Sequence, residues 1–242
     1  MTRRYRVAVE GQIHTAVVSD DREAVLAAKA AGMASVEVLG RSGGGSSFLT
    51  GYAVERLEDL SPEYLEQVVR RHLGLPWEIL RTRRLLIREF QPGDETQVPE
   101  DEEAGRGDEV FRDRELLEAY IRCQYGFCGY GIWAVLEQET GILVGKAGVT
   151  NLEWGPEGTG EPEGALELGY HIFRPWRRKG YGLEACQGIL VWCRDQGLLP
   201  VYAKTDASNE ASAALLRKLG FHLADQRYSG SGPQRDLFVR NY

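Results

Sequence analysis

Cysteine is scarce in this chain, and long hydrophobic runs are missing. Four cysteines among 242 residues are too few for a disulfide scaffold, and no Cys-X-X-Cys pair occurs. No histidine stands at metal-ligand spacing from a cysteine, so we expect reduced thiols and no metal site. No run of about 18 apolar residues is present, which argues against a membrane-spanning helix.

The N-terminus lacks the features of a secretory signal. Residues 1–6 are basic, but no apolar stretch follows them, and a signal peptide requires both. Together with the cysteine usage, this predicts a cytoplasmic protein.

Positive charge is in deficit, because 29 Lys and Arg face 36 Asp and Glu for a net charge of −7. This balance makes nucleic acids and anionic membranes poor general partners. The apolar content of 43% and the charged content of 27% are typical of a globular protein. The length fits one large domain or two modest ones.

The acidic excess gathers in residues 94–109, where eight acidic side chains accompany the single basic residue Arg106. The stretch has no apolar periodicity and contains Pro99, Gly105 and Gly107, which favours a solvated loop or a frayed helix. The alternative is a lid that attracts a cationic substrate.

Residues 1–80 predict a small α/β module. Gly11 separates two strand patterns, Gly32 ends an alanine-rich helix, and the sequence Ser61-Pro62-Glu63 opens a second helix. The expected elements are strands at 6–10, 13–18 and 36–39, a helix at 22–31, a flexible loop at 41–47 and a helix from residue 61 onward.

Residues 81–242 predict a second, larger domain of mixed α/β class with an early antiparallel meander. The expected strands lie at 85–90, 132–136, 142–150, 166–173, 201–204 and on both sides of 230–233, and the expected helices lie at 111–125, 182–196 and 209–219.

A basic, glycine-containing loop is the most informative segment. A strand leads through residues 174–179, which hold four basic side chains, into a helix that opens after Gly180. Helix N-termini present free N–H groups and a positive dipole end, so the loop predicts an anion site of diphosphate size. The spacing matches neither G-x-G-x-x-G nor the Walker loop.

Three motifs stand in order along residues 81–242. They are Thr82-Arg83-Arg84-Leu85-Leu86-Ile87-Arg88-Glu89; Glu167-Leu168-Gly169-Tyr170 with Arg177-Arg178-Lys179-Gly180-Tyr181-Gly182-Leu183-Glu184-Ala185; and Asn209-Glu210-Ala211-Ser212 with Leu216-Arg217-Lys218-Leu219-Gly220-Phe221. The chain resembles the GNAT superfamily of N-acetyltransferases in these motifs, and most of all its ribosomal-protein N-terminal acetyltransferase branch. The resemblance implies a GNAT fold, a mostly antiparallel sheet whose central strands splay apart.

The resemblance also implies acetyl-CoA as co-substrate. The backbone amides of the basic loop would hold the pyrophosphate, the strand end would pair with pantetheine, and an N–H near Ile172 would stabilise the oxyanion. The residues so assigned are Tyr170, His171, Ile172, Arg177, Arg178, Lys179, Gly180, Tyr181, Gly182, Leu183 and Asn209.

The catalytic groups are less well defined by the resemblance. Glu167 is the first candidate for general base, and Ser212 matches a serine that some members of the branch use. His171 is a third candidate, on a strand whose alternation points it away from Glu167. The position of a common base holds Lys204, and the usual general-acid tyrosine aligns with Leu216, so both standard roles stay open.

The acceptor and the first 80 residues leave several alternatives. A protein N-terminus, a polyamine, an aminoglycoside or an amino-acid amine could receive the acetyl group. Tyr125, Phe127, Tyr130 and Trp133 either line that acceptor site or belong to the core.

Residues 1–60 weakly resemble the last β-α-β unit of haloacid-dehalogenase phosphatases but lack their D-x-D segment. This favours a docking or dimerisation module, and a homodimer stays open. The rival to an enzyme is a GNAT-fold module that binds acyl-CoA without turnover, or an interaction protein built around the N-terminal module.

Overall fold

The computed structural model describes residues 1–40, 51–99, 108–152, 164–227 and 235–241. It divides into two compact units, one of Met1–Trp77 with Arg114–Gly129 and one of Glu78–Asp113 with Tyr130–Tyr242. Each unit is described by itself below. The expected loop at 41–47 and the centre of the acidic segment lie outside the described residues.

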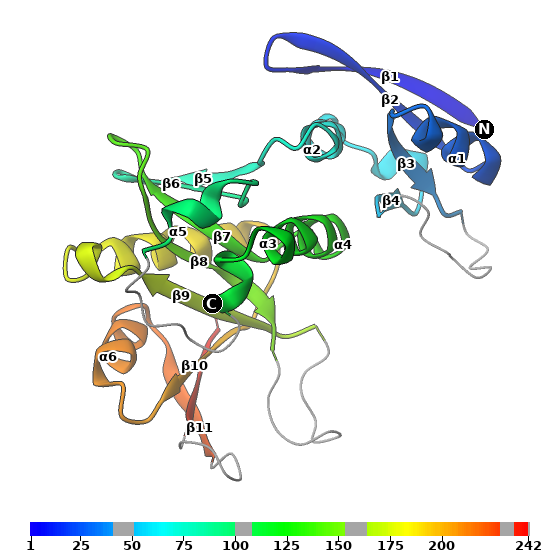
Figure 1. Cartoon of the computed structure of the whole chain (residues 1–242). Coiled ribbons are helices and arrows are strands. Elements are labelled where there is room, and N and C mark those ends of the chain that lie inside the picture. The colour runs from blue at the N-terminus through cyan, green and yellow to red at the C-terminus, as the bar shows by residue number, and fades with distance from the viewer. Residues whose placement is uncertain (41–50, 100–107, 153–163, 228–234, 242) are drawn as a thin grey trace. The chain divides into compact units, whose positions relative to one another are not determined.

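The first unit is built on a four-stranded sheet in the order β1-β2-β3-β4 (Figure 1). β1 and β2 form an antiparallel hairpin around Glu10 and Gly11, whose φ angles of 48° and 75° are those of a tight hairpin turn. β3 runs parallel to β2, and β4 runs parallel to β3. The strands are β1 (Thr2–Val9), β2 (Gln12–Ser19), β3 (Ala34–Val38) and β4 (Ala53–Val54).

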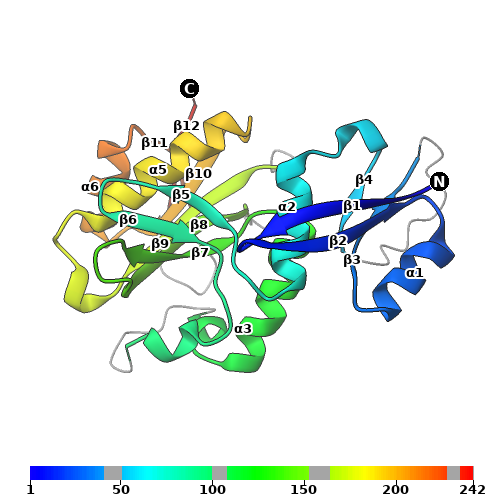
Figure 2. The same ribbon diagram turned by 90° about the horizontal axis from the view of Figure 1, so that it is seen from above.

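Two capped helices pack on this sheet. Asp21 accepts a hydrogen bond from the N–H of Glu23 at 3.0 Å to start α1 (Arg22–Ala30), and Ser61 does the same for the N–H of Tyr64 at 3.0 Å in α2 (Pro62–His72). Figure 2 shows α2 crossing β1 and β2 while α1 lies beside β3. The apolar face of α2 closes the core of the unit, which contains Leu65, Val68, Val69, Val7, Val9, Ala16, Val18, Ala34 and Val36.

The helix expected over residues 111–125 is broken up. Phe111 belongs to the second unit, where its ring lies 4.9 Å from that of Phe90, so the helix starts only after it. After it come α3 (Arg114–Tyr120), a π-helical turn (Ile121–Tyr125) and α4 (Gly126–Cys128), which belong to the first unit. The first unit also contains the short helix η1 (Leu57–Asp59), before α2.

The second unit is built on an eight-stranded sheet in the order β11-β12-β10-β9-β8-β7-β6-β5. The strands from β5 to β9 form an antiparallel meander. The sequence predicted this meander from β6 onward, whereas β5 was not predicted. β10 is two residues longer than the sequence predicted. The strands are β5 (Glu78–Arg81), β6 (Leu85–Arg88), β7 (Ile132–Glu137), β8 (Leu143–Asn151), β9 (Leu166–Ile172), β10 (Val201–Asp206), β11 (His222–Arg227) and β12 (Arg235–Arg240).

β9 and β10 are the parallel pair at the centre of this sheet. They pair only at Val201 with Leu166 and Tyr202 with Glu167, and beyond these residues the two strands separate. This is the splay expected of a GNAT sheet, and it opens a gap in the middle of an otherwise continuous sheet.

Two helices follow the splayed strands. α5 (Tyr181–Asp195) buries Cys186 and Cys193 on one face, as their seven-residue spacing predicted. α6 (Glu210–Lys218) begins at its N-cap Asn209 and is followed by the left-handed Gly220, with φ of 84°. In the described residues, no helix is long and apolar enough to cross a membrane.

The start of the acidic segment is a correction to the sequence analysis. Asp94 is not solvated but 1% exposed, and it opens the short helix η2 (Asp94–Gln97). Both of its carboxylate oxygens accept from the Arg88 guanidinium, at 2.7 and 2.9 Å. The buried, bidentate partner explains why this carboxylate leaves water, whereas composition alone grouped it with its exposed neighbours. The far end of the segment enters η3 (Asp108–Phe111).

Candidate functional site

The gap between β9 and β10 is a cleft with a volume of about 380 Å³. It lies where the strands have separated, and α6 closes one side. Its lining combines apolar, hydroxyl and charged groups: Glu167, Leu168, Gly169, Tyr170, Ala203, Lys204, Thr205, Asp206, Asn209, Ser212, Leu216 and Arg235.

The register of β9 determines which of its backbone groups face the cleft. The N–H of Phe173 donates to the Val144 carbonyl of β8 at 3.0 Å, so alternate residues from Phe173 backward, including His171, bond to β8. The N–H and C=O groups of the residues between them point to the other side, toward β10. Tyr170 and Ile172 therefore offer backbone groups to the gap, whereas the backbone of His171 pairs with Lys146. Glu167 and His171 are four residues apart on this regular strand and lie on the same face of it, so the expectation that alternation points them apart is wrong.

Glu167 and Lys204 form an ion pair across the base of the splay. The Lys204 ammonium lies 2.7 Å from a Glu167 carboxylate oxygen, with side-chain exposures of 14% and 20%. Glu167 lies on β9 and Lys204 on β10, the two strands that separate, and both side chains line the cleft. The carboxylate of Glu167 is thus held in place where the two strands meet.

A hydroxyl pair lies on the opposite wall. The Tyr170 phenol donates to Ser212 Oγ at 3.3 Å, and burial, partly offset by this bond, raises the pKa of Tyr170. The N–H of Ser212 in turn donates to Asn209 Oδ1 at 3.0 Å, the bond that caps α6. Three predicted site residues, Tyr170, Ser212 and Asn209, are therefore brought together in one chain of hydrogen bonds.

The basic loop joins β9 to α5 through the short helix η5 (Arg174–Trp176). Arg178 and Gly180 adopt left-handed φ angles of 62° and 83°, which turn the chain sharply into α5. The first helical N–H groups have no intrahelical acceptor, so those of Tyr181, Gly182 and Leu183 stand at the positive end of the helix dipole.

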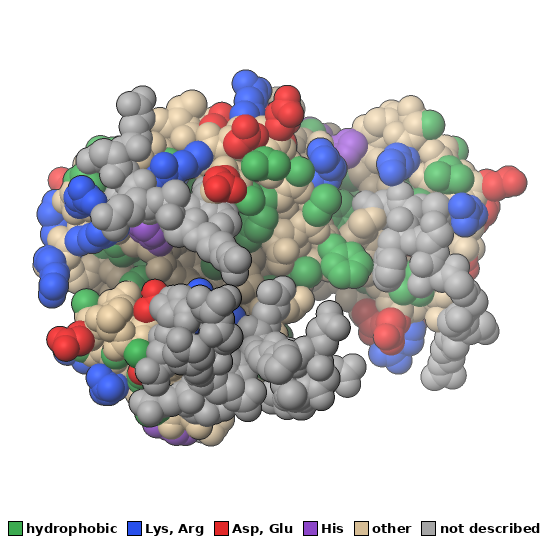
Figure 3. Space-filling model, turned by 60° about the horizontal axis from the view of Figure 1, so that its bottom comes forward, with side chains coloured by type: hydrophobic (Ala, Val, Ile, Leu, Met, Phe, Trp, Pro, Cys, Tyr) green, Lys and Arg blue, Asp and Glu red, His purple; other side chains and the backbone are tan. Residues whose placement is uncertain are grey.

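Basic side chains surround this helix start. Arg174, Arg177, Arg178 and Lys179 are all exposed. Figure 3 shows Lys and Arg side chains gathered at its left, the side on which β9 leads into α5 in Figure 1. The Arg177 guanidinium also donates from Nε to the Ile172 carbonyl at 2.8 Å and lies 3.2 Å from His171 Nε2, which ties the loop to the end of β9.

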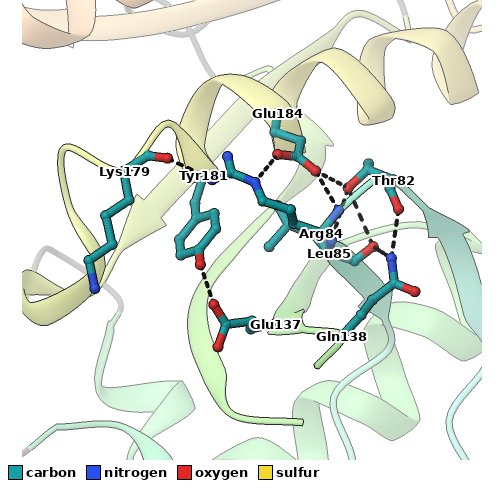
Figure 4. Close-up of polar contacts among 8 residues, drawn as sticks. All are labelled: Thr82, Arg84, Leu85, Glu137, Gln138, Lys179, Tyr181 and Glu184. Carbon is teal, nitrogen blue, oxygen red and sulfur yellow. Dashed lines mark hydrogen bonds and ion pairs between the residues drawn. The ribbon is translucent and has the colours of Figure 1, made fainter. Parts of the chain in front are cut away.

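Glu184 is the hub of a polar network that the sequence analysis did not identify (Figure 4). Its carboxylate accepts from Thr82 Oγ1 at 2.7 Å, from the Arg84 N–H at 2.8 Å and from Arg84 Nε at 2.7 Å. Burial opposes the charge on Glu184, but these hydrogen bonds outweigh it and lower its pKa. Arg84 continues the network by donating to the Lys179 carbonyl at 3.0 Å. The first turn of α5 and the loop before it are thereby fastened to the start of β6.

A second tether fixes the same turn from β7. The Tyr181 phenol donates to Glu137, while the Arg84 guanidinium lies 4.5 Å above the Tyr181 ring. The hydrogen bond with Glu137 raises the pKa of Tyr181, and it lowers the pKa of Glu137. The backbone N–H of Tyr181 stands in the first turn of α5 without an intrahelical acceptor, so it can be offered to an anion while the side chain holds the turn in place.

The aromatic residues considered for an acceptor site divide between core and surface. Trp133 is fully buried and packs edge-on against Trp192 at 5.0 Å, and Tyr125 is buried within the first unit. Phe127 is 73% exposed. Trp133 and Tyr125 are thus core residues.

The sequence could have pointed to the network, because Arg84 and Glu184 both lie inside quoted motifs. Their pairing spans 100 residues, however, and only the packing of α5 against the start of β6 brings them together. Asp206, Thr205 and Arg235 of the cleft were missed for a similar reason, since nothing local marks them.

The fold agrees with a comparison to protein families. The model of the acetyltransferase (GNAT) domain matches residues 84–222, which is more than half of the sequence. The chain therefore belongs to the GNAT acetyltransferase family. The match begins at residue 84, so the resemblance of residues 1–60 to haloacid-dehalogenase phosphatases gains no support from it.

Individual relatives are distant. The uncharacterized N-acetyltransferase YjdG of Bacillus subtilis is 28% identical over 99 residues, which are 40% of this chain and 55% of that protein. The chain thus spans about half the length of this curated relative.

Two solved structures share the fold. Ribosomal-protein-S5-alanine acetyltransferase from Vibrio fischeri has a TM-score of 0.53 at 17% identity, over 66% of this chain and 94% of that one. RimL, a ribosomal L7/L12 alpha-N-protein acetyltransferase in complex with coenzyme A, has a TM-score of 0.51 at 16% identity, over 68% and 97% of the two chains.

Proposed function

We propose that this protein is an N-acetyltransferase that moves the acetyl group of acetyl-CoA to a primary amine by direct attack in a ternary complex. The observation that carries the proposal is the splay of β9 from β10, which leaves the cleft-facing backbone of β9 without a strand partner in the described residues, next to a helix start lined by basic side chains. Family membership supports the same reaction class.

The chain's groups fit the co-substrate in two places. The pyrophosphate carries negative charge, and the N–H groups at the start of α5 together with Arg178 and Lys179 suit it. Pantetheine carries amides, and the outward backbone groups of Tyr170 and the outward N–H of Ile172 can pair with them as an added strand would. Asn209 lies beside this path with its Oδ1 committed to the cap of α6.

In the reaction, the amine nitrogen bonds to the thioester carbonyl carbon and the carbon–sulfur bond breaks. A cleft-facing N–H of β9 near Ile172 would stabilise the oxyanion. Glu167 would accept the proton that the amine loses, and a proton must return to the CoA thiolate. Lys204 would hold the Glu167 carboxylate in place, a positioning role at the position where a base was expected.

The acceptor is proposed as a peptidyl or small primary amine. RimL and the Vibrio fischeri structure are ribosomal-protein acetyltransferases by name, which favours a peptide N-terminus.

The test is release of the CoA thiol from acetyl-CoA with peptide N-termini, polyamines, aminoglycosides and amino acids as acceptors. We expect turnover with at least one class and a fall in kcat of about 100-fold in Glu167→Gln, the scale of a general base. Ser212→Ala is the matched cleft variant, and its smaller effect would separate the carboxylate from the hydroxyl. Unchanged kcat in Glu167→Gln would remove Glu167 as the base.

A second candidate is a module that binds acyl-CoA without turnover. It is favoured by Leu216, which lines the cleft where the family has its general-acid tyrosine, and by the engagement of Glu167 with Lys204. This candidate predicts acetyl-CoA binding with no thiol release for any amine.

A further inference from the structure

The first unit has a groove of its own, which shares no residue with the cleft between β9 and β10. Its volume is about 410 Å³, and it runs between the outer edge of β1 and the start of α2. Four consecutive β1 residues form one wall, and the other wall is mostly apolar: Tyr5, Arg6, Val7 and Ala8 face Leu57, Leu60, Ser61, Pro62, Leu65 and Glu66.

β1 is an edge strand with a free side. In the described residues it pairs with β2 alone, and the sheet ends at β1. Such an edge presents a row of N–H and C=O groups to which another strand can bond.

The hairpin register identifies these groups. Val9 and Gln12 flank a two-residue turn, so they form a hydrogen-bonded pair, and every second residue back along β1 does the same. The bond from the Asp20 N–H to the Met1 carbonyl, at 3.4 Å, has the same parity. The N–H and C=O groups of Arg4, Arg6 and Ala8 therefore point away from β2, to the free edge.

The two faces of β1 differ in chemistry. Tyr5, Val7 and Val9 pack toward α2 in the apolar core. Arg4 and Arg6 are exposed on the opposite face, and no carboxylate within the described residues forms an ion pair with either guanidinium. A strand added to this edge would place alternate side chains against the leucines of the groove and against the arginines.

We infer that this groove binds an extended segment of another protein by adding a strand to β1, and that the segment alternates apolar with acidic residues. The edge supplies main-chain bonds, the groove accepts the apolar side chains, and Arg4 and Arg6 pair with the acidic ones. A second copy of this chain is disfavoured, because antiparallel pairing of two β1 strands sets arginines against arginines.

The test uses the full chain and a labelled ten-residue peptide in which glutamate alternates with valine and leucine, measured by fluorescence anisotropy. One comparison peptide replaces each glutamate by lysine. Another carries N-methyl groups on alternate residues, which removes the donors on one edge of the strand. We expect the acidic peptide to bind. The lysine peptide should have an affinity at least about tenfold lower, and the N-methylated peptide should lose binding.

Protein variants separate charge from backbone. The double variant Arg4→Glu, Arg6→Glu keeps the strand and should weaken binding about tenfold, whereas Arg22→Glu, an exposed charge reversal on α1, should not change it. Arg6→Pro removes an outward N–H, a substitution that edge strands tolerate, and should also weaken binding. Circular dichroism checks that each variant is folded.

Three results would overturn the inference: no binding of the acidic peptide, equal binding of the lysine peptide, or affinity untouched by both Arg6→Pro and the double charge reversal. A concentration-dependent dimer in sedimentation that Arg6→Pro abolishes would instead assign the edge to a second copy. None of these results depends on acetyl transfer.

Discussion

At the scale of single residues, the most consequential group is one that touches no predicted ligand. Glu184 receives three hydrogen bonds from Thr82 and Arg84, and through Arg84 it reaches the Lys179 carbonyl in the basic loop. Its side chain is 17% exposed. The conformation of the basic loop therefore depends on the Glu184 carboxylate, which belongs to the first turn of α5 and not to the loop itself.

Replacing Glu184 by Gln should destabilise the protein and loosen the loop. Charged hydrogen bonds of this kind contribute about 1–3 kcal/mol to the free energy of unfolding. The pKa of Glu184 is lowered in the fold relative to the ordinary value of 4.5, so its contribution is present above that pH and is lost as the pH falls through the folded pKa. Urea unfolding at neutral and acid pH measures this: the gap between wild type and variant should shrink toward acid, and a gap independent of pH would contradict it.

The cysteines give a second test at this scale. Burial raises the pKa of Cys193 to about 12 and that of Cys186 further, and both lie on the inner face of α5, whereas Cys123 is exposed. A thiol reagent should therefore modify Cys123 in the folded protein and leave Cys186 and Cys193 untouched until denaturant is added. Rapid modification of Cys186 or Cys193 in the folded protein would contradict their placement.

At the scale of elements, the strands and helices with a clear period were predictable from the sequence. β7, β8, β9, α5 and α6 begin and end within a few residues of their expected bounds, because apolar periodicity and caps are local signals. β4 and β5 are short and carry no such signal. The buried pairing of Asp94 with Arg88 could not be predicted from composition, because it depends on two segments meeting.

The same division holds for the site. The basic loop and the motif that contains Asn209 and Ser212 were identified from the sequence. The structure joins Tyr170, Ser212 and Asn209 by hydrogen bonds, and it adds the capping role of Asn209, which the sequence did not predict. The engagement of Glu167 with Lys204 was not foreseen, because Lys204 was considered only as a missing base. Two side chains 37 positions apart meet there because β9 and β10 are paired at their starts.

A pair of glycines tests the packing of the meander. Gly148 on β8 and Gly169 on β9 are partners in register. A Cβ at Gly148 would collide with the Gly131 carbonyl oxygen, whereas one at Gly169 would meet only Ile132 Cδ1 at an ordinary 3.4 Å. Gly148→Ala should lower the free energy of unfolding by about 1–3 kcal/mol or more, and Gly169→Ala by much less. Thermal unfolding compares the stabilities of the two variants. Equal stabilities would contradict the close approach of β8 at Gly148 to the chain at Gly131 and Ile132.

At the scale of the whole molecule, the first unit is discontinuous in sequence. Arg114–Gly129 clusters with Met1–Trp77, although the sequence places it between elements of the second unit. Within the first unit, Gly126 lies beside Tyr52, at 3.7 Å from the phenol oxygen to a Cβ placed on the glycine. The sequence places a boundary near residue 80, between a small module and a transferase domain, and this division of roles stays a prediction.

Truncation to residues 78–242 tests this organisation. The cut separates Arg114–Gly129 from Met1–Trp77, with which it forms one compact unit, so we expect a lower melting temperature and increased binding of a hydrophobic dye. A truncated chain with unchanged melting temperature would show that residues 1–77 contribute nothing to that segment.

The account rests on acetyl-CoA binding to the cleft and the loop, and isothermal titration of the full chain with acetyl-CoA measures it most directly. We expect about one site per chain, competition by CoA, and an affinity reduced about tenfold or more in Arg178→Glu, since that change reverses a charge beside the proposed pyrophosphate site. The charge reversal Arg22→Glu, on α1 of the first unit, should leave the affinity unchanged. Absence of acetyl-CoA binding to the folded wild-type chain, or equal affinity in Arg178→Glu and wild type, would contradict the account.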